Sequence, residues 1–340
     1  MNPFKTFWKT FPALSRMLAL CLGLSSVTYV VLLALFRDSR PGLFLLGDSC
    51  TGNYRLDAGT RFQDDLRRLL PGWHVENWAL PGAKPLDYFL QLTKGEALAG
   101  KPRVVVVAMA SDKFLGTVHR FDADGENLRY LPVDGTGLAC FRRLDEHERN
   151  VAGVQRIALP LFLTFDALRE AWVQYIQWPH ERAAMRASTP KRKAKIADRA
   201  RQNGLEMEAV TIGSDREWDT LTLARDLEFL FDNSRSRGII VEAVILPFAN
   251  PALVDTTWSD SARAKRDLSI LRMRTWLEAR GVPYVDFNEA RHQSHFPEPA
   301  WDDVFHLKSP EAYQYMASEI AKAVPPLFVK SCQAGDRHDR

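Results

Sequence analysis

The sequence predicts an α/β domain, a five-stranded parallel sheet with helices on both faces, preceded by one N-terminal transmembrane helix. Strand-like and helix-like segments alternate along most of the 340 residues, which is typical of a parallel sheet. Residues 103–109, RVVVVAM, form the continuous apolar run expected of a strand covered on both faces. Residues 17–36 carry no charged side chain, and a helix of that length spans roughly 30 Å, the thickness of a bilayer's hydrocarbon core.

The segment 17–36 is best interpreted as an uncleaved anchor. A signal peptide has an apolar region of about 7 to 15 residues and a small-x-small cleavage site, which does not follow here. A lipoprotein would need a small residue before Cys21, where Leu20 stands. A buried core helix is the remaining alternative.

The charges around the anchor predict its orientation. Basic side chains precede it without any acid among them: Lys5, Lys9 and Arg16. This bias places residues 1–16 in the cytoplasm and the rest of the chain outside. The sequence therefore predicts a single-pass protein of the bacterial inner membrane, with a periplasmic domain over residues 41–328 and a loose tail over 329–340.

The elements of the domain follow in order. Strands are expected at 42–46, 75–80, 103–109, 238–246 and 282–287. Helices are expected at 54–70, 84–98, 215–236, 260–280 and 309–324. The first helix places Phe62, Leu66, Leu69 and Leu70 on one face. Gly281 suits a helix C-cap, whereas Ser309 and Pro310 suit the start of the last helix.

Residues 113–213 interrupt the alternation and are interpreted as an insertion between the third and fourth strands. An aromatic segment, 157–178, is either the core of the insertion or a belt at the level of lipid headgroups. The basic run 182–201 is either a solvated helix face or a contact for anionic lipid or glycan.

Composition excludes several classes of protein. The 45 basic and 42 acidic residues give a net charge of +3, which argues against a nucleic-acid partner. The four cysteines form no C-x-x-C pair, so they are free thiols, or Cys140 pairs with Cys332. His292 and His295 are expected on the surface. We therefore expect no metal site and no cofactor.

The chemistry-bearing residues stand at two places. Ser49, in the stretch LLGDSCTG, lies just past the first strand, at the edge where open α/β sheets bind ligands. A serine nucleophile needs a base, and WDDVFHLKSP carries His306 three residues after Asp303. Asp302 is an alternative to Asp303, and Ser49 could instead cap the helix that follows it.

Three sequence blocks resemble the SGNH, or GDSL, hydrolases. GDSCTG, NWALPG at 77–82 and DDVFH are similar to the first, second and last blocks of that family, and together they frame residues 42–324. The resemblance implies a flavodoxin-like sheet, with Ser49 as nucleophile, His306 as base and Asp303 as its orienting acid. It also implies an oxyanion hole made by the backbone N–H groups of Ser49 and Gly82.

The third family block departs from the pattern. The family's G-x-N-D reads MASD here, so Ser111 takes the position of the asparagine oxyanion donor. A serine hydroxyl can donate but is shorter and rotates. Loss of one good oxyanion donor costs on the order of 10² to 10³ in rate. This departure favours a specialised acyltransferase or deacylase over a fast, broad esterase.

The layout is similar to membrane-anchored SGNH proteins that accompany membrane-bound O-acyltransferases. That similarity implies a membrane-bound O-acyltransferase as partner, an acylated glycan of the cell envelope as substrate, and a serine acyl-enzyme as intermediate. Two alternatives stay open: a lipase or esterase that faces the membrane, and a non-catalytic scaffold that binds the acyltransferase or the glycan.

Overall fold

A computed structural model describes most of the chain. It covers residues 12–36, 38–48, 50–51, 62–80, 82–110, 130, 134–142, 144, 146, 149–150, 152–153, 159–172, 190–209 and 222–335. These residues form a five-stranded sheet of β1 (Gly42–Leu46), β2 (His74–Asn77), β3 (Val104–Met109), β4 (Ile240–Ile245) and β5 (Tyr284–Asp286). All neighbouring pairs are parallel, and the order is β2-β1-β3-β4-β5. The predicted fold class is thereby confirmed for the sheet.

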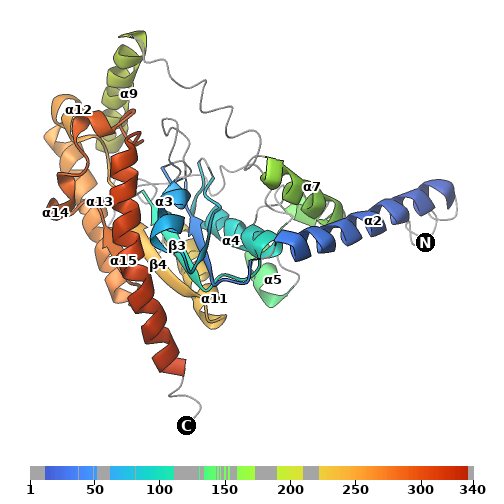
Figure 1. The fold of residues 1–340 in the computed structure, drawn as a ribbon. Helices are drawn as coiled ribbons and strands as arrows, with labels where there is room; N and C mark the ends of the chain where they lie inside the picture. The colour runs from blue at the N-terminus through green and yellow to red at the C-terminus, as the bar shows by residue number, and fades with distance from the viewer. Residues whose placement is uncertain are drawn as a thin grey trace.

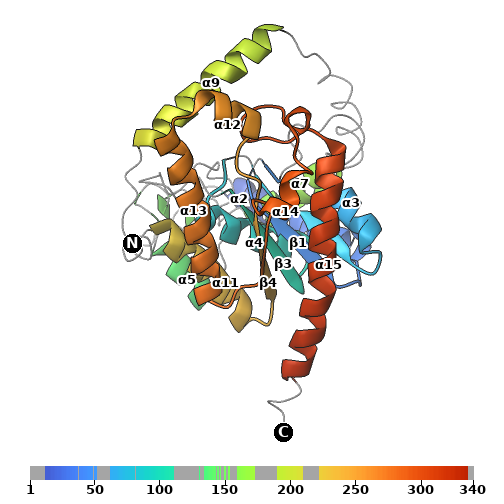
Figure 2. The ribbon, with the colours of Figure 1, turned by 90° about the vertical axis from the view of Figure 1, so that its left-hand side faces the viewer.

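Helices cover both faces of the sheet (Figures 1 and 2). On one face lie α3 (Phe62–Leu69) and α15 (Pro310–Gly335); on the other lie α4 (Pro85–Ala99), α11 (Thr222–Ser236) and α13 (Asp260–Ala279). The strand β3 shows why its sequence is continuously apolar. Val104 and Val106 pack against the α3 and α15 face, whereas Val105 and Val107 pack against the opposite face.

Some boundaries differ from the expected ones. The strand β2 ends at Asn77 and not at 80, because the Asn77 side chain accepts from the backbone N–H of Ala79 at 3.0 Å and turns the chain. The helix α15 continues to Gly335, past residue 324 and into the segment expected to be loose, since a nucleated helix gains one bond with each added residue. Leu69 is 47% exposed, because Phe62 and Leu66 are the apolar side chains on the buried face of α3.

Three helices are described within the predicted insertion 113–213: α5 (Gly135–Phe141), α7 (Leu159–Trp172) and α9 (Pro190–Ala209). The helix α9 is docked on α12 (Pro251–Thr257) and α13, where the indole Nε1 of Trp258 donates to the Ala200 carbonyl at 3.0 Å. A Cβ on Gly204 would lie 2.9 Å from that indole, so the contact requires glycine. The described part of the insertion therefore contacts the domain through α9, through α7, which lies against α4, and through Cys140 of α5, which is buried in the core.

The N-terminal helix α2 (Pro12–Phe36) lies beside α7 and projects from the domain (Figure 1). Among the described residues, no helix meets the length and apolarity needed to cross a membrane. The predicted anchor at 17–36 is not confirmed and stays a prediction. Two shorter helices, α14 (Ala290–Gln293) and the 3₁₀ turn η4 (Glu298–Ala300), connect β5 to the segment before α15.

Candidate active site

The sequence segments that follow β1, β2 and β3 all begin at one edge of the sheet. Parallel strands end at the same edge, and the registers pair Leu45 with Asn77 and Leu46 with Val107. The chain passes from β1 to β2 on one side and returns to β3 on the other, so β1 and β3 flank the topological switch point. Ligands of open α/β sheets bind there. Ser49 and Ser111 belong to this edge by sequence, but both lie outside the described residues.

Gly47, the first residue of the first block, is fixed by hydrogen bonds and by close packing. The buried side-chain amide of Gln91 accepts from the Gly47 N–H at 3.0 Å and donates to the Gly47 carbonyl at 2.9 Å. A Cβ on Gly47 would lie 2.5 Å from Thr51 Oγ1 and 2.9 Å from the Ala108 carbonyl oxygen. This position accepts only glycine, and the chain leaves β1 here along one fixed path.

The residues on either side of position 49 form a turn around Asp48. The Asp48 carboxylate accepts from the Cys50 N–H at 2.9 Å, and its carbonyl accepts from the Thr51 N–H at 3.1 Å. Asp48 is 1% exposed. It therefore stabilises the turn between Asp48 and Thr51.

The second block is tied directly to the first. The Asn77 side chain donates to the Thr51 carbonyl at 2.9 Å, and the Leu80 N–H donates to the Gly47 carbonyl at 3.1 Å. Gly82 has φ +73°, a left-handed conformation that glycine adopts without steric penalty. The turn that bears Gly82 is thus fixed beside the first block. Its role as an oxyanion donor stays a prediction.

The last block forms a closed loop, residues 302–306, which we call the DxxH loop. An isolated bridge between Trp301 and Leu307 closes its base, and the Asp302 N–H donates to the His306 carbonyl at 2.8 Å. Inside it, His306 Nδ1 lies 2.9 Å and 3.0 Å from the two carboxylate oxygens of Asp303. The structure therefore brings together the two residues that the sequence spacing singled out, and it places Asp303, not Asp302, on the imidazole.

The carboxylate of Asp303 is arranged to stay ionised. Burial opposes ionisation, but the hydrogen bond and charge of His306 outweigh it. The backbone N–H groups of Phe305 and His306 also donate to Asp303, at 2.9 Å and 2.8 Å. Together they hold the pKa of Asp303 well below its usual range. An ionised partner at Nδ1 fixes the imidazole orientation and leaves Nε2 for proton transfer, with the tautomer assigned from this bond.

Direct contacts join the first and last blocks. The Cys50 thiol lies 3.6 Å from the Phe305 carbonyl oxygen, so the neighbour of position 49 contacts the neighbour of His306. The Tyr313 hydroxyl, on the second turn of α15, donates to the Cys50 carbonyl at 3.1 Å. Tyr313 is fully buried, and burial together with the nearby Cys50, Asp48 and Asp303 raises its pKa far above the usual range. It remains a neutral donor that pins the turn at position 49 to α15.

The expectation for His292 needs correction, and the structure decides between the two interpretations of Cys140. His292 is 1% exposed and not a surface residue, because its Nδ1 lies 2.6 Å from the Tyr315 hydroxyl and its ring packs on Phe287. His295 is exposed, as expected, and stacks on the Tyr315 ring. Cys140 is a reduced thiol buried in the core and does not pair with Cys332. No group of three or more metal-ligating side chains gathers among the residues that the structure describes.

The sequence analysis missed the residues that assemble the site. Gln91 and Tyr313 are the clearest cases, and each is a polar side chain on an otherwise apolar helix face. That pattern is a usable signal, since a buried polar group requires a hydrogen-bond partner. A third support, the Asn250 N–H that donates to the Val304 carbonyl at 2.7 Å, is a backbone contact, which side-chain patterns do not reveal.

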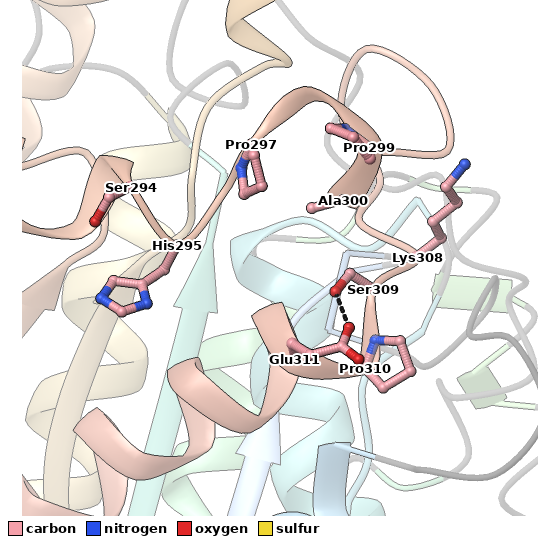
Figure 3. A pocket seen from close by; sticks show the side chains of 9 residues that line it. All are labelled: Ser294, His295, Pro297, Pro299, Ala300, Lys308, Ser309, Pro310 and Glu311. Atoms are coloured by element: carbon pink, nitrogen blue, oxygen red, sulfur yellow. Dashed lines mark hydrogen bonds between the residues drawn. The ribbon is translucent and has the colours of Figure 1, made fainter.

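A cavity of about 530 Å³ lies beside the base of the DxxH loop (Figure 3). Its walls come from the segment before the loop and from the first turn of α15: Ser294, His295, Pro297, Pro299, Ala300, Lys308, Ser309, Pro310 and Glu311. The Ser309 hydroxyl donates to the Glu311 carboxylate at 2.5 Å within this wall. Neither Asp303 nor His306 lines the cavity, so it is separate from the imidazole–carboxylate pair.

Comparisons with known proteins find likeness only among solved structures; no family model and no curated protein matches the chain. A lipase/acylhydrolase from Enterococcus faecalis has 12% identity and a TM-score of 0.40, over 84% of this chain and 95% of that one. An extracellular lipase from Streptomyces rimosus has 12% identity and a TM-score of 0.39, over 82% and 99%. Phospholipase A1 from Streptomyces albidoflavus has 13% identity and a TM-score of 0.38, over 84% and 99%.

The fold assignment rests on the chain's own strand order and register, and not on these distant likenesses. The flavodoxin-like order of the sheet is the one that the sequence blocks implied. Three of those blocks lie where the resemblance requires, after β1, after β2 and just before α15. In its sheet and in the positions of these blocks, the chain is similar to the SGNH, or GDSL, hydrolases.

Proposed function

We propose that this chain is a serine acyl-ester enzyme, a hydrolase or acyltransferase, with Ser49 as its nucleophile. The observation that carries the proposal is the DxxH loop. It holds His306 on an ionised Asp303 and contacts the turn at position 49 through Cys50 and Phe305. Nucleophilic acyl transfer needs a serine and an imidazole that a carboxylate orients, and the loop that holds this imidazole contacts the residue after Ser49 in the sequence.

The proposed reaction has two steps. In the first, Ser49 Oγ attacks the ester carbonyl carbon while His306 Nε2 takes the hydroxyl proton. The tetrahedral intermediate collapses, the bond to the alcohol oxygen breaks, and His306 returns the proton to that leaving alcohol. In the second step, water or a sugar hydroxyl attacks the acyl-serine, again through His306, and Ser49 regains its proton. Asp303 stays ionised and stabilises the imidazolium in both steps.

The proposed oxyanion hole favours a slow, selective enzyme. Two of its donors are backbone N–H groups, of Ser49 and of Gly82. The third is the Ser111 hydroxyl in place of an asparagine amide. A rotatable hydroxyl donates less firmly than a fixed amide, and one weakened donor costs on the order of 10² in rate. We therefore infer transfer to, or removal from, a particular acceptor in preference to hydrolysis of any ester.

The proposed location is the outer face of the inner membrane. The helix α2 exposes aliphatic side chains, such as Leu20 at 61% and Val27 at 62%. Only residues 37–41 separate α2 from β1, and at no more than ~3.6 Å per residue this linker keeps the domain at the bilayer. An acylated glycan of the cell envelope would be within reach there, and a membrane-bound O-acyltransferase could act beside it. Both assignments are analogies to anchored SGNH proteins.

Acyl-enzyme formation tests the proposal. The full chain in detergent would be mixed with p-nitrophenyl acetate and p-nitrophenyl palmitate, with and without acetyl-free xylan oligosaccharides as acceptor. We expect a burst of nitrophenol with the short ester, an acetylated Ser49 peptide by mass spectrometry, and neither in Ser49→Ala. A faster reaction with the long acyl chain would favour the membrane-facing lipase. Equal turnover by Ser49→Ala would refute the serine mechanism, and no turnover by either would favour the scaffold.

A further inference from the structure

The helix α7 is joined to the middle of α2 by a buried polar seam. The Ser25 hydroxyl donates to the Pro160 carbonyl at 2.8 Å, and the Thr164 hydroxyl donates to the Ser25 carbonyl at 2.7 Å. The two hydroxyl oxygens lie 2.8 Å apart, and both side chains are buried. Small and hydroxyl-bearing residues at a helix–helix seam are typical of helices that associate in lipid, where aliphatic contact alone gives no driving force.

The outer faces of the pair are mostly apolar, with Thr28 on α2 and Arg169 on α7 as exposed polar side chains. The large exposed side chains are Met17, Leu18, Leu20, Leu24, Val27, Val30 and Val31 of α2 and Phe165 and Leu168 of α7. The two helices lie side by side (Figure 1), so these side chains belong to one surface. This arrangement, with polar groups between the helices and apolar groups outside, is the reverse of that in a helix pair in water. Exposed apolar surfaces of this kind mark interaction sites.

Hydroxyl groups elsewhere on α2 are satisfied without water. The Ser26 hydroxyl donates to the Leu22 carbonyl and the Thr28 hydroxyl to the Leu24 carbonyl, both at 2.8 Å. Each bond runs back to the carbonyl four residues earlier in the same helix. Such bonds matter where no solvent can satisfy a hydroxyl, as in hydrocarbon. The α2 surface is therefore compatible with acyl chains along its exposed length.

The position of the seam sets its depth. Ser25 precedes the end of α2 at Phe36 by 11 residues, about 16 Å at the helical rise, against a hydrocarbon core of about 30 Å. A bilayer crossed by 17–36 would thus hold the first turn of α7 near its middle. With 14 residues, or about 21 Å, α7 is too short to span. One turn beyond the seam, the Tyr29 hydroxyl donates to the Ala97 carbonyl at the end of α4, which ties α2 to the domain.

Charge at the domain end of α2 fits a lipid headgroup. A cavity of about 240 Å³ lies where the chain leaves α2 and enters β1, and its lining includes Arg40, Lys101 and Arg103. Asp38 is the one acid in that lining, and it is paired with Arg40. The lining is therefore net cationic, as expected for a surface that meets anionic headgroups.

We propose that α7 enters the bilayer beside α2, so that the insertion contributes a second, non-spanning membrane element whose ligands are acyl chains of anionic phospholipid. This inference rests on the proposed anchor, and it deepens the account of where the enzyme sits. It assigns Phe165 and Leu168 to lipid contact and gives the seam at Ser25 and Thr164 the task of fixing the domain's orientation on the membrane. The acyl-ester chemistry could then act only on substrates presented at that fixed distance.

Quenching by brominated lipid tests the proposal. The full chain would carry Cys50→Ala, Cys140→Ala and Cys332→Ala, be labelled with a nitrobenzoxadiazole dye, and be placed in vesicles of phosphatidylethanolamine and phosphatidylglycerol with acyl-chain bromines. The native Cys21 on α2 reports the anchor. In separate Cys21→Ala chains, Phe165→Cys reports α7 and Leu205→Cys is the control. Leu205 is 61% exposed on α9, which lies far from α2 (Figure 1).

We expect the dye at Phe165→Cys to lose fluorescence to an extent comparable with Cys21, and the dye at Leu205→Cys to lose none. Leu168→Cys, 48% exposed on the next turn, gives a second reporter if Phe165→Cys misfolds. Quenching at Cys21 without quenching on α7 would overturn the proposal and keep the anchor. No quenching at either position would overturn both and point to a protein partner on this surface. Ester hydrolysis by the wild-type chain, with Cys50 intact, in vesicles of the same lipids reports the enzymatic proposal separately.

Discussion

Two carboxyl groups of the domain, one in the DxxH loop and one in a central strand, have opposite environments. Asp303 lies in the DxxH loop and accepts from one imidazole and two backbone N–H groups. Glu242 lies in the middle of β4, opposite Val106, and is 1% exposed. Neither of its carboxylate oxygens has a hydrogen-bond partner among the described residues. The pKa values of the two groups shift in opposite directions. The hydrogen bonds of the loop hold the pKa of Asp303 far below its usual range, whereas burial raises the pKa of Glu242 to about 8.

The difference follows from where backbone donors are available. In the middle of a central strand the ladder already uses the N–H groups, so a side chain placed there finds no donor. At the carboxyl edge of the sheet the chain turns, and loop N–H groups become available to a carboxylate. Ionising a carboxyl group therefore takes little free energy at the edge of the sheet and much more in the middle of the strand. The proposed acid–base chemistry therefore has its ionised carboxylate at the edge of the sheet.

The largest effect is expected from neutralising the edge carboxylate. Asp303→Asn keeps the size of the side chain but cannot hold the imidazole in the same tautomer or stabilise its charged form. We expect ester turnover to fall by about 10³ to 10⁴. The matched control is Asp302→Asn, one residue away, which should stay within about threefold of the wild type because Asp302 supplies a backbone bond to the loop. Equal losses in the two variants would show that the loop's fold matters and the carboxylate does not.

The second-largest effect is expected on the free energy of unfolding, and it comes from the carboxyl group of Glu242 in β4. The folded-state pKa of Glu242, about 8, exceeds its ordinary value of 4.5, so the folded chain holds a proton that the unfolded chain releases. The unfolding free energy therefore falls as pH rises from about 4.5 to 8 and levels off above. Glu242→Gln, neutral at every pH, should be more stable than the wild type by about 4 kcal/mol at pH 8.

Chemical denaturation at two pH values checks this expectation. At pH 5 the two proteins should differ by less than about 1 kcal/mol, because Glu242 is then largely protonated in the folded chain. A variant less stable than the wild type at pH 8 would show that the carboxylate has a partner that stabilises its charged form. The contrast between the strand and the edge would then be lost.

The smallest expected effect concerns the hydrogen bond that joins the edge to α15. Tyr313→Phe removes the donor to the Cys50 carbonyl and should destabilise the fold by about 1 to 2 kcal/mol. Turnover should fall less than about tenfold, since the turn at position 49 keeps its Asp48 and Cys50 contacts. Tyr315→Phe is the control on the same helix. It removes the bond to His292 and should lower stability similarly with turnover unchanged.

The strands and the Asp303–His306 pair could be predicted from the sequence, although the contacts that support the candidate site could not. Residues 42–46 and 104–109 are read correctly as strands because runs of apolar side chains between breakers have few other interpretations. The pairing of Asp303 with His306 is predictable because both lie on one short loop. Spacing within a segment is local information, and it fixes local geometry.

The supports of the site are long-range contacts and depend on packing. The Gln91 amide reaches Gly47 across 44 positions, and the Tyr313 hydroxyl reaches Cys50 across 263. Local periodicity places such a side chain on a buried face but does not name its partner. The same limit explains His292, which looks like a loop residue until Tyr315 packs over it. It also explains α7, whose position beside α2 depends on a seam between residues 139 positions apart.

The central claim is that Asp303 and His306 activate Ser49, and covalent labelling tests it most directly. The full chain would be treated with a fluorophosphonate probe over a range of pH, and the labelled peptide would be identified by mass spectrometry. We predict label on Ser49 in the wild type and no label in Ser49→Ala or His306→Ala. Label on another residue, or on Ser49 at the same rate in His306→Ala, would contradict the claim.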